Sequence, residues 1–222
     1  MKLDFWHERW SKGEIGFHQQ DFNKYMRAFM DRLGIKQGGH ILVPLCGKSL
    51  DMIWLLEHGY QVTGIEISGV AVDDFFKENN IACRITELPG AKLYISERLS
   101  IYCADFFSVE LTKSPRIDAV YDRASLIALP QDMRPDYVKR LTNLLAEGTR
   151  SLLLTLDYPQ QQMSGPPFSV TPDEVDRLFS EKYEIEHLHS EDCLANQPRF
   201  REKGLTSLVE HVFLLQKQAD KF

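Results

Sequence analysis

The sequence lacks the features that mark membrane proteins and nucleic-acid-binding proteins. No apolar run in the 222 residues approaches the about 20 residues that a membrane-spanning helix needs. Residues 1–7 carry an acid and a histidine where a signal peptide requires an unbroken apolar stretch. The formal net charge is -6, and a mildly acidic surface repels phosphate backbones and anionic membranes alike. We therefore expect a cytoplasmic protein that binds neither nucleic acid nor membranes.

Cysteine is scarce and scattered. The four cysteines, at positions 46, 83, 103 and 193, form no CxxC pair and have no metal-ligand spacing. A chain of this length buries most of its apolar surface without cross-links. We expect reduced thiols and no metal site. Cys46 is interpreted as a buried structural thiol rather than a nucleophile.

Both common glycine-rich phosphate-binding motifs are also absent. A dinucleotide fold uses GxGxxG after its first strand, and a P-loop uses GxxxxGK[ST]. After the first predicted strand the chain has only Gly47, and Gly47-Lys48-Ser49 matches the tail of a P-loop alone. Lys48 is therefore interpreted as a solvated side chain. The loop favours an adenosyl ligand without phosphates.

Patterns of buried strands alternate with helical patterns along the chain. Helical spacing is found over residues 23–33, 50–58, 70–79, 136–145 and 172–179, with Ser49 and Thr171 as predicted N-caps. Short apolar runs predict strands over residues 40–45, 61–67, 92–95, 99–104, 117–121, 151–156, 183–189 and 209–216. This alternation predicts a doubly wound α/β fold with a mostly parallel sheet. We expect a single domain over residues 1–222, with a helical segment at 1–35 and an α/β core at 40–222.

Sheets of this class bind ligands beyond the carboxyl ends of their strands. Glu66 lies at the end of the second predicted strand, shortly after the first strand, loop and helix. A carboxylate at that place accepts hydrogen bonds from both hydroxyls of a ribose. The sequence therefore predicts a nucleoside site at Glu66.

Several motifs together resemble the thiopurine S-methyltransferase family in its bacterial form, and the resemblance covers nearly the whole chain. The motifs are Phe5-Trp6-His7-Glu8-Arg9-Trp10, Ile15-Gly16-Phe17-His18-Gln19, Pro44-Leu45-Cys46-Gly47-Lys48-Ser49, Gly64-Ile65-Glu66-Ile67-Ser68, Tyr121-Asp122-Arg123-Ala124 and Gly165-Pro166-Pro167-Phe168. The resemblance implies the class I fold of methyltransferases that use S-adenosyl-L-methionine. It also implies methylation of small aromatic or heterocyclic thiols, and of selenium or tellurium species. We expect a monomer whose partner is a small-molecule thiol.

The resemblance also implies roles for individual residues. Leu45 would contact the cofactor, Glu66 would bind its ribose, and Trp10 would close over its methionine end. Arg123 would lie near both cofactor and acceptor, and Phe17 would line the acceptor pocket. Asp105-Phe106 would flank the adenine. No catalytic residue in the strict sense is implied.

Residues 1–20 are interpreted as a lid, because they carry Trp6, Trp10 and Phe17 among many polar residues before the first strand. The alternative is that these aromatic side chains belong permanently to the core. Likewise, Arg123 has a plain alternative as the ion-pair partner of Asp122.

Three other functions compete with the thiol methyltransferase. A halide or thiol methyltransferase shares the cofactor-binding half, and a non-catalytic adenosyl-ligand sensor binds the cofactor without turnover. A nicotinamide-dependent dehydrogenase is disfavoured, because the glycine fingerprint is missing.

Overall fold

The computed structural model describes residues 3–13, 19 and 21–219. The chain divides into two compact units, Met1–Tyr121 and Asp122–Phe222. The first unit contains helices α1 (Leu3–Ser11), α2 (Lys24–Phe29), α3 (Asp51–Glu57) and α4 (Gly69–Glu78), with a 3-10 turn, η1, at Met30–Leu33. Its strands are β1 (His40–Val43), β2 (Gln61–Glu66), β3 (Arg84–Leu88), β4 (Ala91–Ile95), β5 (Leu99–Cys103) and β6 (Ala119–Arg123), which carries the boundary between the units.

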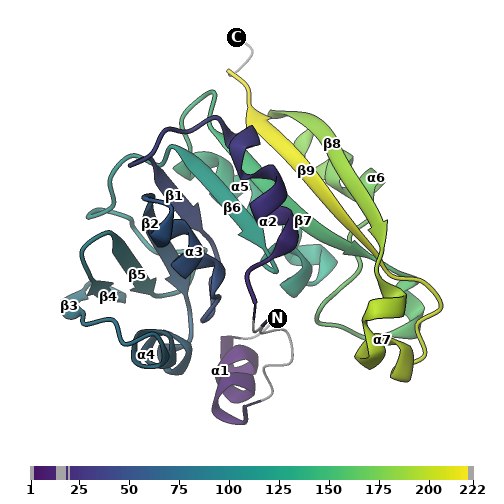
Figure 1. Ribbon diagram of the computed structural model, residues 1–222, viewed down its shortest axis with the longest axis horizontal. Coiled ribbons are helices and arrows are strands. Elements are labelled where there is room, and N and C mark those ends of the chain that lie inside the picture. The colour runs from purple at the N-terminus through teal and green to yellow at the C-terminus, as the bar shows by residue number, and fades with distance from the viewer. Residues whose placement is uncertain (1–2, 14–18, 20, 220–222) are drawn as a thin grey trace. The chain divides into compact units, whose positions relative to one another are not determined.

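Strands β1 to β6 follow the order β3-β4-β5-β2-β1-β6 (Figure 1). Strand β1 pairs in parallel with β2 on one side and with β6 on the other, and β2 pairs in parallel with β5. Strands β3, β4 and β5 are joined by antiparallel pairing. Strands β2 and β6 thus lie on opposite sides of β1. The carboxyl end of β1 is therefore a switch point of the kind at which α/β sheets bind ligands.

A buried carboxylate, Asp51, joins three elements of the first unit. Its Oδ1 accepts the backbone N–H of Asn23 at 2.8 Å, and its Oδ2 accepts the Tyr121 hydroxyl at 2.9 Å. Asn23 in turn caps α2, because its side-chain oxygen accepts the N–H groups of Tyr25 and Met26. The start of α2, the start of α3 and strand β6 are therefore fixed by one side chain.

The second unit contains helices α5 (Arg134–Leu144), α6 (Pro172–Phe179) and α7 (Pro198–Glu202), with 3-10 turns at Leu126–Ala128, Gln131–Met133, Gln160–Gln162 and Leu194–Asn196. Its strands β7 (Arg150–Asp157), β8 (Tyr183–Asp192) and β9 (Val209–Lys217) are antiparallel in the order β7-β9-β8. Figure 1 shows β8 and β9 as two long neighbouring strands. Their pairing is interrupted between His187 and His189.

All predicted elements are present, and their ends differ from the prediction by at most three residues; the helix predicted over 23–33 consists of α2 followed by η1. Helix α6 begins as predicted, with Pro172 first and the Thr171 hydroxyl accepting the N–H of Glu174 at 3.2 Å. The residue directly before α3 is Leu50, which makes no side-chain cap, but the predicted capping bond is present, because the Ser49 hydroxyl accepts the N–H of Asp51 at 3.3 Å. Strand β3 and helix α7 were not predicted. Over the part of the chain that the structure describes, no helix combines the length and apolar character of a membrane span.

Candidate functional site

The loop after β1 turns sharply at two residues. Leu45 and Gly47 both have positive φ, 44° and 52°, a region that residues with a side chain rarely adopt. The turn is closed by the N–H of Cys46, which donates to the carbonyl of Ile65 in β2 at 3.0 Å, and by the N–H of Ser49, which donates to the Cys46 carbonyl at 3.1 Å. The turn therefore brings the backbone of residues 45–47 against the end of β2.

Glu66 lies directly beside this turn. Its Oε2 accepts the N–H of Gly47 at 2.9 Å, and its Oε1 accepts the N–H of Ser68 at 2.8 Å. The side chain is only 5% exposed, and this burial raises the pKa of Glu66 to about 7, against the lowering effect of the N–H donors. A carboxylate has about four lone-pair sites on its two oxygens, and the backbone of Ile67 also contributes a hydrogen bond to Glu66. Glu66 therefore retains acceptor capacity for a ribose hydroxyl.

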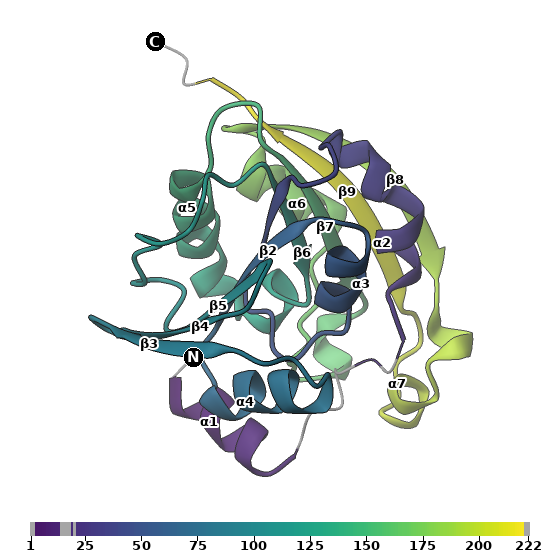
Figure 2. The same cartoon turned by 60° about the vertical axis from the view of Figure 1, so that its left-hand side comes forward.

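Trp10 covers the other side of the turn. The indole is 5% exposed, and a Cβ at Gly47 would lie 3.1 Å from its Cζ2 atom. Helix α1, which carries Trp10, packs against α4 (Figure 2). Position 47 thus requires glycine twice, for its backbone conformation and for the room that the indole leaves.

The segment after β5 reaches the same edge of the sheet. The N–H of Ala104 donates to the Glu66 carbonyl at 2.8 Å, so Asp105 and Phe106 follow immediately beside β2. Asp105 caps its own turn by accepting the N–H of Phe107 at 3.0 Å, and Phe106 is buried. Five of the residues predicted around the cofactor are therefore together in the first unit: Trp10, Leu45, Glu66, Asp105 and Phe106.

The prediction that Lys48 is solvated is wrong. Lys48 is 7% exposed; its Nζ donates to Glu78 Oε1 at 2.6 Å and lies 3.7 Å from Asp74 Oδ2. The sequence did not reveal this pairing because both carboxylates belong to α4, which is separated from Lys48 along the chain by α3 and β2. Lys48 thus fastens the turn to α4.

Cys46 is buried as expected. Its Sγ lies 2.7 Å from the place that a Cβ at Gly64 would occupy, and burial, followed by the charge of Glu66, raises the pKa of the Cys46 thiol well above its usual value. A thiol that stays protonated is no nucleophile. All four cysteines are free thiols. Within the described ranges, no group of three or more His, Cys, Asp and Glu side chains is arranged to hold a metal ion.

The two remaining predicted residues are Arg123, which belongs to the second unit, and Phe17. Arg123 is the half-buried last residue of β6, and Asp122 before it is buried, with Oδ2 accepting the Tyr137 hydroxyl at 2.6 Å. Burial raises the pKa of Asp122 to about 6. The assigned role of Arg123 stays a prediction, and Phe17 lies outside the described residues.

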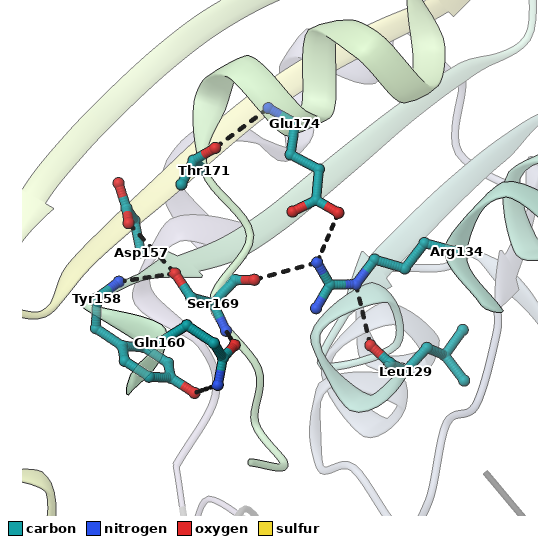
Figure 3. A network of polar contacts seen from close by, with 8 residues as sticks. All are labelled: Leu129, Arg134, Asp157, Tyr158, Gln160, Ser169, Thr171 and Glu174. Atoms are coloured by element: carbon teal, nitrogen blue, oxygen red, sulfur yellow. Dashed lines mark hydrogen bonds and ion pairs between the residues drawn. The ribbon is translucent and has the colours of Figure 1, made fainter. Parts of the chain in front are cut away.

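Sequence reasoning missed a polar network in the second unit. The guanidinium of Arg134 bonds the carbonyls of Leu129 and Ser169 and the carboxylate of Glu174 (Figure 3). These partners are distributed over 46 positions (129 to 174), so no local pattern announces them. The local sequence shows only that Arg134 precedes Pro135 at the start of α5, which does not indicate burial of the guanidinium.

Comparison with known proteins gives a consistent result over the chain. The family described as "Thiopurine S-methyltransferase (TPMT)" matches residues 1–218. A thiopurine S-methyltransferase of Shewanella baltica (strain OS185) is 44% identical over 98% of this chain and 100% of its own length. One from Pseudomonas fluorescens is 40% identical over 98% of each chain.

Solved structures with low sequence identity share the fold. An S-adenosylmethionine-dependent methyltransferase from Anabaena variabilis is 14% identical, with a TM-score of 0.66 over 97% of this chain and 95% of its own. The 1,6-didemethyltoxoflavin-N1-methyltransferase of Burkholderia thailandensis, solved with S-adenosylhomocysteine, is 16% identical, with a TM-score of 0.65 over 98% and 87%. The predicted fold class, a doubly wound α/β fold of the class I methyltransferase type, is thereby confirmed, whereas the N-terminal lid stays a prediction.

Proposed function

The chain belongs to the thiopurine S-methyltransferase family, and on this premise we propose that it transfers a methyl group from S-adenosyl-L-methionine to the sulfur of small aromatic or heterocyclic thiols. The observation that carries the proposal is the family match over residues 1–218, which includes the turn at Gly47 and the carboxylate of Glu66. The acceptor is a small molecule, and selenium or tellurium species are further candidates because they are soft nucleophiles too.

The residues around Glu66 fit the adenosyl part of this cofactor. The carboxylate retains acceptor capacity after accepting the N–H groups of Gly47 and Ser68. The turn at residues 45–47 contains a single glycine rather than a glycine-rich phosphate-binding motif. The neighbouring Lys48 is already paired with Glu78 and offers no free cation to a phosphate. In our assignment Glu66 binds the ribose, Leu45 contacts the cofactor beside β1, and Trp10 covers its methionine end.

Most of the rate comes from positioning in this proposal. When bound, S-adenosyl-L-methionine supplies a methyl group that its sulfonium charge makes electrophilic. Glu66 and the turn hold the nucleoside in a fixed place, and the indole of Trp10 keeps water out. Arg123 stabilises the anionic form of the acceptor, and Phe17 is assigned to the lining of the acceptor pocket on the family resemblance alone. Such alignment contributes roughly 7–11 kcal/mol in favourable cases.

No dedicated general base is required for the favoured acceptors. Aromatic thiols are acidic, so they are largely thiolate near neutral pH and their proton goes to solvent before transfer. The new bond joins the acceptor sulfur to the methyl carbon, and the methyl–sulfonium bond breaks, leaving a thioether and S-adenosylhomocysteine. A cation such as Arg123 lowers the pKa of a nearby thiol and extends the reaction to less acidic acceptors.

Mass-spectrometric assay of methyl transfer across thiols, selenols and halides tests the proposal. We expect turnover to be fastest with aromatic and heterocyclic thiols. Preference for halides would instead identify a halide methyltransferase, and cofactor binding without any turnover would identify an adenosyl-ligand sensor; either result would contradict the proposal. Gel filtration and cell fractionation check the expected monomer and the expected cytoplasmic location.

A further inference from the structure

Arg134, the first residue of α5, is buried in the second unit with its charge neutralised. The side chain is 2% exposed. Its Nη1 donates to Glu174 Oε1 at 2.7 Å and to the Ser169 carbonyl at 3.1 Å, and its Nε donates to the Leu129 carbonyl at 3.0 Å. Glu174 is itself 8% exposed. The pair is thus withdrawn from water and supplied with further hydrogen bonds, the arrangement in which a buried ion pair is tolerated.

The guanidinium joins three separate segments of the second unit (Figure 3). Leu129 lies in the loop that follows β6, Ser169 in the loop that follows β7, and Glu174 in the first turn of α6. Both loops follow the carboxyl ends of strands, the places at which folds of this class form their ligand sites. Arg134 therefore links the two loops, because its guanidinium donates a hydrogen bond to a carbonyl of each.

A second set of bonds holds the loop after β7 from its other side. The Ser169 hydroxyl accepts the N–H of Tyr158 at 3.0 Å, and the Ser169 N–H donates to Gln160 Oε1 at 2.9 Å. The Tyr158 hydroxyl donates to the Pro167 carbonyl at 2.6 Å. The backbone on each side of Phe168 is thus fixed between β7 and the guanidinium.

Phe168 receives its place from this arrangement. Its N–H donates to the Ile127 carbonyl at 2.7 Å, which sets it beside the loop that begins after Arg123. The ring centroid lies 6.0 Å from the guanidinium carbon of Arg134, and the ring covers Gly165 so closely that a Cβ there would collide with it. Phe168 and residues 165–167 remain half-buried, whereas Ser169 and Arg134 are buried.

We propose that Arg134 and Glu174 are positioning residues for the acceptor: they fix the loop at residues 165–170 against the loop at residues 124–129 without touching the acceptor. Replacing a buried ion pair by apolar side chains often costs a protein no stability, so the pair has more value as a geometric constraint than as a source of stability. The half-buried faces of Phe168 and residues 165–167 are then the part of the loop that meets the acceptor. This inference rests on the proposed methyltransferase function.

Two matched variants test it. Glu174→Gln and Asp173→Asn each remove one negative charge from the first turn of α6, but Asp173 is exposed. For Glu174→Gln we expect kcat/KM for heterocyclic thiols to fall on the order of tenfold to a hundredfold, with a smaller loss for small aliphatic thiols. The dissociation constant of S-adenosylhomocysteine, measured by calorimetry, should stay within error. Asp173→Asn should change none of these quantities.

Backbone hydrogen exchange gives a measurement that needs no turnover. In Glu174→Gln the amides of Phe168, Ser169 and Val170 should exchange faster, whereas Asp173→Asn should leave them protected. Arg134→Lys keeps the charge and loses the fork of donors, so it should act in the same direction and serves if Glu174→Gln does not fold. If the wild-type protein methylates no thiol, the proposed function fails, and the exchange measurement still decides whether the pair orders this loop.

The proposal is overturned by either of two results. One is unchanged exchange at residues 168–170 in both Glu174→Gln and Arg134→Lys. The other is a parallel loss of cofactor affinity and of kcat/KM for every thiol, with an unchanged preference between heterocyclic and aliphatic thiols, which would assign the pair a purely structural role.

Discussion

The carboxylate of Glu66 accepts the backbone N–H of Gly47 at 2.9 Å, so the end of β2 and the turn after β1 are held by one hydrogen bond. The bond depends on the charge state of Glu66, because an ionised carboxylate only accepts hydrogen bonds. Burial raises the pKa of Glu66 to about 7, so this charge state changes near neutral pH. The shape of the turn and the titration of Glu66 are therefore coupled.

Cofactor binding should weaken on acidification. Below a pKa of about 7 Glu66 becomes protonated and loses acceptor capacity for the ribose hydroxyls. The dissociation constant of S-adenosylmethionine should rise as the pH is lowered from about 8 to about 6. In Glu66→Gln the dissociation constant should be higher at every pH and should change less with pH. Calorimetry at several pH values measures both. Equal pH dependence of the two proteins would remove Glu66 from the ribose site.

Stability should show the opposite trend with pH. The pKa of Glu66 in the folded chain, about 7, lies above its ordinary value of 4.5, so folding disfavours the ionised form. The resulting destabilisation is absent below pH 4.5, grows as the pH rises to about 7 and then stays constant, on the order of 3 kcal/mol. Urea unfolding measures the free energy of unfolding of wild type and of Glu66→Gln. As the pH rises through this window, the stability of Glu66→Gln should increase relative to that of wild type. A pH-independent difference would contradict the raised pKa.

Gly47→Ala should cost more than the backbone conformation alone requires. Gly90 also has positive φ, 72°, but nothing lies within 4 Å of the place that its Cβ would occupy. Gly90→Ala should therefore cost about 1 kcal/mol from the left-handed backbone. Gly47→Ala adds the contact with Trp10 and should cost about 2 kcal/mol or more, with weaker cofactor binding. Thermal unfolding of both variants checks this. An equal loss of stability in the two variants would show that the Trp10 side chain moves aside without an energetic cost.

Trp10→Ala distinguishes a lid from a permanent core residue. The indole is buried against Gly47, which favours the core interpretation for this side chain. The variant should then lose about 3 kcal/mol of stability or more without ligand. If cofactor binding orders the segment instead, hydrogen exchange near Trp10 should be fast without ligand and slow with S-adenosylhomocysteine, and the variant should lose turnover with little loss of stability.

Arg123→Ala should reveal whether the guanidinium favours a thiolate. Weakly acidic thiols should lose more activity than strongly acidic ones, and their pH–rate profile should move to alkaline pH, because the acceptor then ionises without help from a cation. Rate measurements from about pH 6 to about pH 9 with two thiols of different acidity suffice. An equal loss for both thiols without a shift would assign Arg123 to cofactor binding or to structure.

The sequence was sufficient where a feature depends on near neighbours. Thr171 and Pro172 mark the start of α6 because a cap acts within one turn. The position of Glu66 at the end of β2 was predicted correctly, because that strand follows the first strand, loop and helix at a regular spacing, whereas its role at a ribose stays a prediction.

The sequence was insufficient where a side chain is decided by distant partners. Lys48 reads as a solvated lysine in its own loop, yet Glu78 and Asp74 on α4 engage it. Arg134 and Glu174 are 40 positions apart, and nothing in either local pattern predicts that they meet. Strand β3 escaped because its residues are mostly exposed or half-buried, so it shows no apolar alternation.

The contact between Trp10 and Gly47 gives the protein an optical reporter beside the proposed cofactor site. Indole emission depends on the polarity and rigidity of the surroundings, and the other two tryptophans have different environments: Trp6 meets Phe5 edge-on with ring centroids 5.3 Å apart, and Trp54 stacks on His58 at 3.6 Å. A ligand that displaces or encloses Trp10 changes the light that this one ring emits. Titrations can therefore be followed by intrinsic fluorescence, without a dye and without waiting for a product.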